Sequence, residues 1–204
     1  TVRADGSSKF APGNKWSNFA SGAIAWRASE EEFIKRLNIF SNLKVRASYG
    51  QTGNQAIGAY ATRDYLTVAN YPINGALASG FANLTWRGPA NPDLKWETTS
   101  QYNVGVDMTL LKGLVVFNGD FYVKDTENLL LPLTVAPSTG FNSYVENIGK
   151  LRNTGIEGRL RLNLIRDTQR DLRWNVTLSA FHNKSKITKL SNQLEEINKY
   201  ANSD

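Results

Sequence analysis

Between residues 98 and 110 the chain reads T-T-S-Q-Y-N-V-G-V-D-M-T-L, and apolar and polar residues alternate along it with a period of two. Successive side chains of a β-strand point to opposite sides, so this period predicts a strand with two unlike faces. One face is apolar throughout and carries Tyr102, Val104, Val106, Met108 and Leu110. The opposite face is polar and carries Gln101, Asn103, Gly105, Asp107 and Thr109. Such a strand separates two different environments.

The same alternation occurs in residues 43–49 and 156–164, where leucine, valine or isoleucine positions oppose lysine, arginine, glutamate or asparagine. Further strands are predicted over residues 16–27, 114–124, 154–165 and 173–181, with a weaker one over 60–68, for a total of about seven. Helical periodicity is nearly absent. The short charged stretch 29–38, with Ser29 as N-cap, is the one helix that the pattern suggests, and it fits a loop equally well.

Composition narrows the classes of protein. The chain has 204 residues, of which 41% are hydrophobic and 21% are charged, which is typical of a folded protein. No apolar run approaches the ~18 residues of a membrane-spanning helix. The mean hydropathy of -0.40 suits a membrane barrel, whose strands are apolar only at alternate positions. The absence of cysteine excludes disulfides, thiolate metal sites and cysteine nucleophiles. The net charge is +6, but the basic residues are scattered, so nucleic-acid binding is not expected.

The predicted connections alternate in length. Residues 111–113 and 166–172 form short polar turns, whereas residues 51–97 and 125–153 are long and rich in Gly, Pro, Asn and aromatic residues. Outer-membrane barrels have short periplasmic turns and long extracellular loops. We therefore expect an all-β fold, a segment of an antiparallel up-and-down transmembrane β-barrel with long extracellular loops.

Tryptophans lie near the predicted strand ends, at Trp16, Trp26, Trp96 and Trp174. Two interpretations fit this placement equally well. The rings lie at the level of the lipid headgroups, or they cap the core of the sheet.

Five phrases are similar to those of a known family. They are D-G-S-S-K-F (5–10), L-K-V-R-A-S-Y-G-Q-T-G-N-Q-A-I-G-A-Y (43–60), N-P-D-L-K-W-E-T-T-S-Q-Y-N-V-G-V-D (91–107), D-F-Y-V-K-D-T-E-N-L-L-L (120–131) and N-I-G-K-L-R-N-T-G-I-E (147–157). In this order they resemble the SusC/RagA-type TonB-linked outer-membrane proteins, which import nutrients into Gram-negative bacteria of the Bacteroidetes group. The blocks span most of the chain.

The resemblance implies a location and partners. Members have a 22-stranded barrel occluded by a plug, a TonB box and a SusD-like surface lipoprotein partner, and they take up oligosaccharides or peptides in a TonB-dependent manner. Residues 1–204 match part of the carboxy-terminal half of the barrel domain, without the plug or TonB box. We therefore expect a bacterial outer-membrane location, with TonB acting through a plug region outside these residues. An open sheet of about seven strands leaves two unpaired edges, each costly in hydrocarbon, so this segment needs the rest of its barrel.

Two groups of residues are candidates for function. The residues expected to face the lumen are polar positions of the strands: Gln101, Asn103, Asp107, Asn118, Asp120, Arg159 and Arg161. The candidates for cargo contact are aromatic residues of the long loops, because sugars and peptides stack on such rings: Tyr60, Tyr65, Tyr71, Trp86 and Tyr144. The alternative is that these rings only pack the loops against one another.

Catalysis, cofactors and metals are not expected. Asp120, Asp125 and Glu127 provide carboxylates, but alternation puts Asp120 and Asp125 on opposite faces. His182 is the only histidine, so a two-histidine metal site is excluded. The alternative function is that of a soluble antiparallel β-domain that binds glycans, with the apolar faces packed in a dry core. An uncharacterised hydrolase is a third class, and the sequence lacks the nucleophile constellation it needs.

Overall fold

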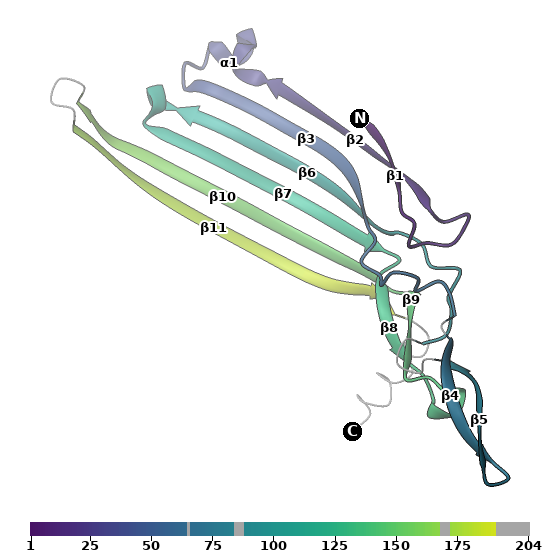
Figure 1. Cartoon of the computed structure of the whole chain (residues 1–204). Coiled ribbons are helices and arrows are strands. Elements are labelled where there is room, and N and C mark those ends of the chain that lie inside the picture. Colours follow the sequence, from purple (N-terminus) through teal and green to yellow (C-terminus); the bar gives the residue numbers. More distant parts are fainter. Residues whose placement is uncertain (65, 84–87, 168–171, 191–204) are drawn as a thin grey trace.

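The main feature of the computed structural model is a long, twisted sheet whose strands run in the order β1-β2-β3-β6-β7-β10-β11 (Figure 1). The structure describes residues 1–64, 66–83, 88–167 and 172–190. The strands of this sheet are β1 (Val2–Gly6), β2 (Trp16–Arg27), β3 (Phe40–Asn54), β6 (Glu97–Leu110), β7 (Val115–Glu127), β10 (Lys150–Asp167) and β11 (Leu172–Lys189). Every neighbouring pair is antiparallel. The predicted all-β, antiparallel, up-and-down arrangement is confirmed.

Two separate hairpins interrupt this meander. One consists of β4 (Leu66–Ile73) and β5 (Ala76–Asn83), and the other of β8 (Leu130–Thr134) and β9 (Ser143–Asn147). Both lie beyond the same end of the large sheet (Figure 1). The β4–β5 turn is Asn74-Gly75, with φ of 51° and 81°. Positive φ at both central residues matches the right-handed twist of a hairpin, which explains the Asn-Gly pair.

The short connections lie at the opposite end. Strands β2 and β3 are joined by η1 (Ala28–Glu30) and the single-turn helix α1 (Glu32–Lys35), and β6 and β7 by η2 (Leu111–Gly113). The chain reverses sharply in η2, where Leu111, Lys112 and Gly113 all have positive φ. The predicted short turn at 111–113 is therefore confirmed, whereas most of the other predicted short turn, 166–172, lies outside the described residues. None of the helices described here has the length and apolarity needed to cross a bilayer.

Several predicted boundaries are wrong. Strand β1, which was not predicted, ends at Asp5 and Gly6, and among the described strands it pairs only with β2. Tyr60 has a φ of 62° in a loop, so the weak strand at 60–68 begins only at Leu66. Strand β11 continues well past residue 181 because its polar second half pairs with β10. Of the stretch 29–38 only α1 is α-helical, and its N-cap is Glu31 rather than Ser29.

The strand register separates two faces, here named the apolar face and the polar face. One transverse row of the apolar face contains Leu43, Met108, Phe117, Leu160 and Leu178, which pair in that order across β3, β6, β7, β10 and β11. Apolar residues of this face are exposed: Val104 is 54% exposed, Ile156 57% and Leu178 60%. A soluble domain would bury such a face, so the dry core of the glycan-binding alternative is not present on it among the described residues.

Candidate functional site: the polar face and the loop end of the sheet

Arg46 organises the centre of the polar face. The register places it opposite Gly105 of β6, which lies opposite Asp120 of β7. The guanidinium donates to both carboxylate oxygens of Asp107, with Nε–Oδ2 and Nη2–Oδ1 distances of 2.9 and 3.2 Å, and Nη2 donates to Asp120 Oδ2 at 3.1 Å. Asn118 Nδ2 also donates to Asp107 Oδ1, at 2.9 Å. These four side chains, named the Arg46 network, link three adjacent strands.

Gly105 makes room for this network. A Cβ atom on Gly105 would lie 2.5 Å from Asp120 Oδ1 and 2.6 Å from Arg46 Nη2, closer than real side chains approach. The side chains of Arg46, Asp107 and Asp120 are 33%, 24% and 28% exposed. Because both carboxylates are held by the same guanidinium, the geometry suits a hydrated polar wall and leaves neither carboxylate free as a general base.

All seven residues predicted to face the lumen lie on the polar face. Gln101 and Asn103 share it with the Arg46 network, and Arg159 pairs with Asn118 and Arg161 with Val116. The network joins only Asp107, Asn118 and Asp120 of the predicted set. Arg46 was missing from that set, although its place between Val45 and Ala47 in an alternating segment was the signal that could have found it.

The three aromatic loop candidates among the described residues, Tyr60, Tyr71 and Tyr144, lie on different segments. Tyr60 is 57% exposed with the Arg63 guanidinium 6.0 Å from its ring centre, and Tyr71 is 45% exposed on β4. Tyr144 lies on β9 and is partly buried. Its hydroxyl donates a hydrogen bond to Glu146 Oε2 at 2.8 Å. This hydrogen bond, together with burial, raises the pKa of Tyr144. No ring contact joins these three in the described part of the chain. Tyr65 and Trp86 lie outside the described residues.

The buried core lies where the loops meet the sheet. Its members, named the loop-base core, are Phe10, Phe19, Ile57, Leu94 and Trp96, each no more than 7% exposed. The Trp96 ring lies 5.3 Å from the ring of Phe10 and 5.9 Å from that of Phe19, measured between ring centres. Its indole Nε1 donates to the carbonyl of Lys15 in the β1–β2 connection, at 3.3 Å.

The two interpretations of the tryptophans now separate. Trp96 caps a core, whereas Trp16, Trp26 and Trp174 are 72%, 51% and 55% exposed. Of the two interpretations, Trp96 therefore fits the second, a ring that caps a core. The reason is that Trp96 precedes β6 and packs against the β1–β2 connection, on the ring of Phe10 and near the carbonyl of Lys15.

Asn147, the last residue of β9, connects the two loop regions. Its Oδ1 accepts from the backbone amide of Lys95 at 2.8 Å, and its Nδ2 donates to the carbonyls of Lys95 at 2.8 Å and Asn128 at 2.9 Å. Asn91 Nδ2 likewise donates to the carbonyl of Val145 at 2.9 Å. Lys95 and Asn147 thus join the phrases 91–107 and 147–157, which carry the resemblance.

Replacing Asn147 with leucine is expected to lower the free energy of unfolding of this region by about 2–3 kcal/mol, because three hydrogen bonds to backbone groups are lost, one of them part-buried. Limited proteolysis of the receptor that contains this chain measures the effect as faster cleavage in residues 88–96 and 128–147. Asn70→Leu, on exposed β4, is the control and should leave the cleavage rate unchanged. Equal rates in all three proteins would contradict a bridging role for Asn147.

The remaining candidates for catalysis or metal binding lie apart from the Arg46 network. Asp125 forms an ion pair with Arg152 at 2.6 Å and Glu127 with Lys150 at 2.6 Å, both away from the Arg46 network. His182 pairs with Ile156 and shares its apolar face. Within the described ranges no three His, Asp or Glu side chains form a metal-binding group.

A family model described as TonB dependent receptor-like, beta-barrel, matches residues 1–202. The chain belongs to the TonB-dependent receptors of the SusC/RagA type. It is 41% identical over 188 residues to TonB-dependent receptor P26 of Formosa agariphila, covering 92% of this chain and 18% of that protein. It is 34% identical over 197 residues to TonB-dependent receptor SusC of Bacteroides thetaiotaomicron, covering 94% of this chain and 19% of that protein.

Solved structures of the RagAB peptide importer show the same fold. The open-open state superposes with a TM-score of 0.77 at 34% identity, over 94% of this chain and 20% of the RagAB chain. The chain thus spans about a fifth of the length of these TonB-dependent receptors. It is part of an outer-membrane receptor barrel. Among the described strands, β1 and β11 lie at the two edges of the sheet.

Proposed function

We propose that this segment forms part of the wall and outer loops of a TonB-dependent importer. The observation that carries the proposal is the pairing of an exposed apolar face with a polar face, with both long loops at one end of the sheet. In this arrangement the apolar face contacts lipid, and the polar face, with Arg46 at its centre, lines the lumen. The segment takes no part in bond-breaking chemistry.

The proposed cargo is an oligosaccharide or a peptide. RagAB is described as a peptide importer, and its similarity to this chain supports that cargo class. The exposed Tyr60 and Tyr71 rings offer stacking surfaces at the loop end. A SusD-like surface lipoprotein is the proposed partner above these loops, and TonB acts through a plug region that is not among these residues.

Surface labelling tests the direction of the segment. An epitope inserted at Asn74, in the β4–β5 turn, or at Ser138, between β8 and β9, should be labelled on intact cells. An epitope at Lys112, in the β6–β7 turn, should be labelled only after the outer membrane is permeabilised. Labelling of Lys112 on intact cells would reverse the topology and with it the assignment of the loops to recognition.

Removing the β4–β5 hairpin tests its role in uptake. Among the strands that the structure describes, β4 and β5 pair only with each other, so replacing residues 66–83 by a short Gly-Ser linker should leave barrel assembly intact. We expect cargo uptake to fall at least tenfold, measured with labelled oligosaccharide and peptide pools. The control is an Asn70→Ala receptor, which should transport normally. Unchanged uptake after deletion would exclude the hairpin from cargo recognition.

A further inference from the structure

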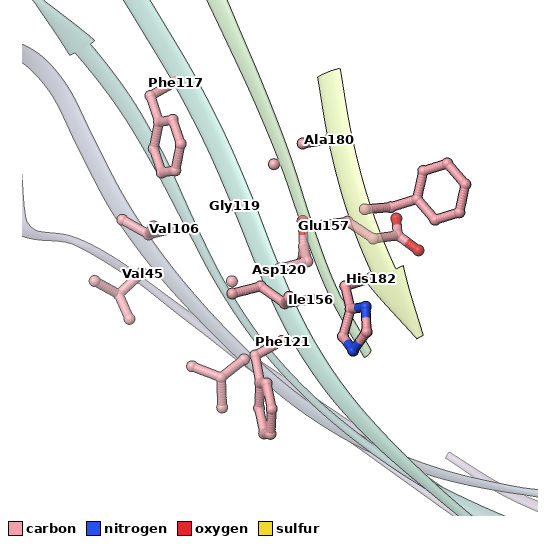
Figure 2. A pocket seen from close by; sticks show the side chains of 14 residues that line it. Val45, Val106, Phe117, Gly119, Asp120, Phe121, Ile156, Glu157, Ala180 and His182 are labelled. Atoms are coloured by element: carbon pink, nitrogen blue, oxygen red, sulfur yellow. The ribbon is translucent and has the colours of Figure 1, made fainter. Parts of the chain in front are cut away.

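A groove crosses the apolar face at a row of small residues. Gly119, Gly158 and Ala180 pair with one another across β7, β10 and β11 and leave a groove of about 530 Å³. Phe117 bounds it toward the short turns, and Phe121 and Ile156 bound it toward the loops (Figure 2). The apolar walls and elongated row suit a hydrocarbon chain.

The apolar face becomes cationic immediately beyond this groove. On β11 its successive residues are Leu172, Trp174, Val176, Leu178, Ala180, His182, Lys184 and Lys186. His182 lines the groove, and Lys184 and Lys186 follow toward the loops. On neighbouring β10, Thr154 pairs with Lys184 and Arg152 with Lys186, so the change occurs at the same level in both strands.

Among the described strands, Lys184 and Lys186 have no acidic side chain as a partner. The acidic residues of this region are Asp125 and Glu127 of β7, and these pair with Arg152 and Lys150. Across the described ranges, neither Lys184 nor Lys186 has a carboxylate oxygen within 4.0 Å. Both side chains are exposed. Within the described part of the chain, two positive charges without a carboxylate partner therefore lie at the edge of an apolar groove.

We propose that this surface is a binding site for one phosphorylated glycolipid of the outer leaflet. An acyl chain lies in the groove over Gly158 and Ala180, and the phosphate contacts Lys184 and Lys186. The proposal rests on the proposed function in one respect, that the loop end faces the cell exterior. The charge complementarity selects an anionic headgroup, since exposed lysines beside a bilayer attract anionic lipid. The groove selects an amphiphile over free phosphate.

The test measures lipid binding to the purified receptor barrel in detergent, by native mass spectrometry with phosphorylated lipid A as the probe. Lys184→Gln together with Lys186→Gln should weaken binding about 30-fold, from roughly fivefold for each lysine at a charged lipid surface. The matched control is Lys44→Gln together with Lys124→Gln, two lysines of the polar face, which should bind like the unmodified receptor. Heat-modifiability on gels confirms that each variant is folded.

A second arm keeps the lysines and fills the groove. Gly158→Leu together with Ala180→Leu should weaken lipid A binding at least tenfold, whereas inorganic phosphate at millimolar concentration should not displace the lipid. Absence of bound lipid, equal binding by the lysine variant, equal loss in the control, or displacement by inorganic phosphate would each overturn the site. Because binding is measured without cargo or TonB, its failure is distinguishable from failure of the proposed transport function.

Discussion

Replacing Trp96 with alanine is expected to destabilise the loop end of the receptor by about 3–5 kcal/mol, the cost of removing a large buried aromatic side chain. Trp96 is 7% exposed and is packed against Phe10 and Phe19. It also holds the β1–β2 connection through Lys15. The change removes packing and a hydrogen bond at once. Thermal unfolding in detergent should show the loss, and protease should cut residues 7–15 and 88–96 faster.

Two control variants separate the contributions. Trp16→Ala, at a tryptophan that is 72% exposed, should change the melting temperature much less. Trp96→Phe keeps most of the ring contact and loses the hydrogen bond to the carbonyl of Lys15. This variant should therefore lower the free energy of unfolding by about 1 kcal/mol. Equal damage from Trp16→Ala and Trp96→Ala would show that the loop-base core does not anchor the loops.

An arginine in place of Leu160 is expected to impair barrel assembly severely. Leu160 lies in the transverse row that also contains Phe117 and Leu178, in the middle of the apolar band. Arginine on the lipid-facing surface of a barrel costs about 2–4 kcal/mol near the bilayer midplane. Folding can be measured as the heat-modifiable fraction of the receptor in outer membranes, which should fall several-fold.

The adjacent residue provides the control. Arg161 follows Leu160 in the chain but lies on the polar face. Arg161→Leu therefore replaces arginine by leucine on the polar face, the reverse of the change at Leu160 on the apolar face. That variant should assemble normally, because lumen positions tolerate substitution. If both variants assembled equally, the assignment of the apolar face to lipid would be wrong.

The alternation of apolar and polar residues was sufficient to predict the β-strands and the face on which each side chain lies. In residues 98–110 and 156–164 each side chain lies in either an apolar or an aqueous environment. Because the period is two, the position of a residue in the strand determines which of the two faces it joins. All seven predicted polar-face residues therefore lie on one face in the structure. Strand pairing in β1 and the second half of β11 was not predictable this way, because these segments pair through backbone groups and lack an apolar stripe.

Tertiary structure alone decided what the loop residues do. Trp96 and Asn147 are far apart from their partners Phe10 and Lys95 in the chain, so no local period reveals that they form the base of the loops. The Arg46 network and the groove over Gly119, Gly158 and Ala180 likewise depend on how several strands are aligned. Side-chain period is a property of one strand, whereas register between strands, which brings distant residues into one row, exists only in the folded sheet.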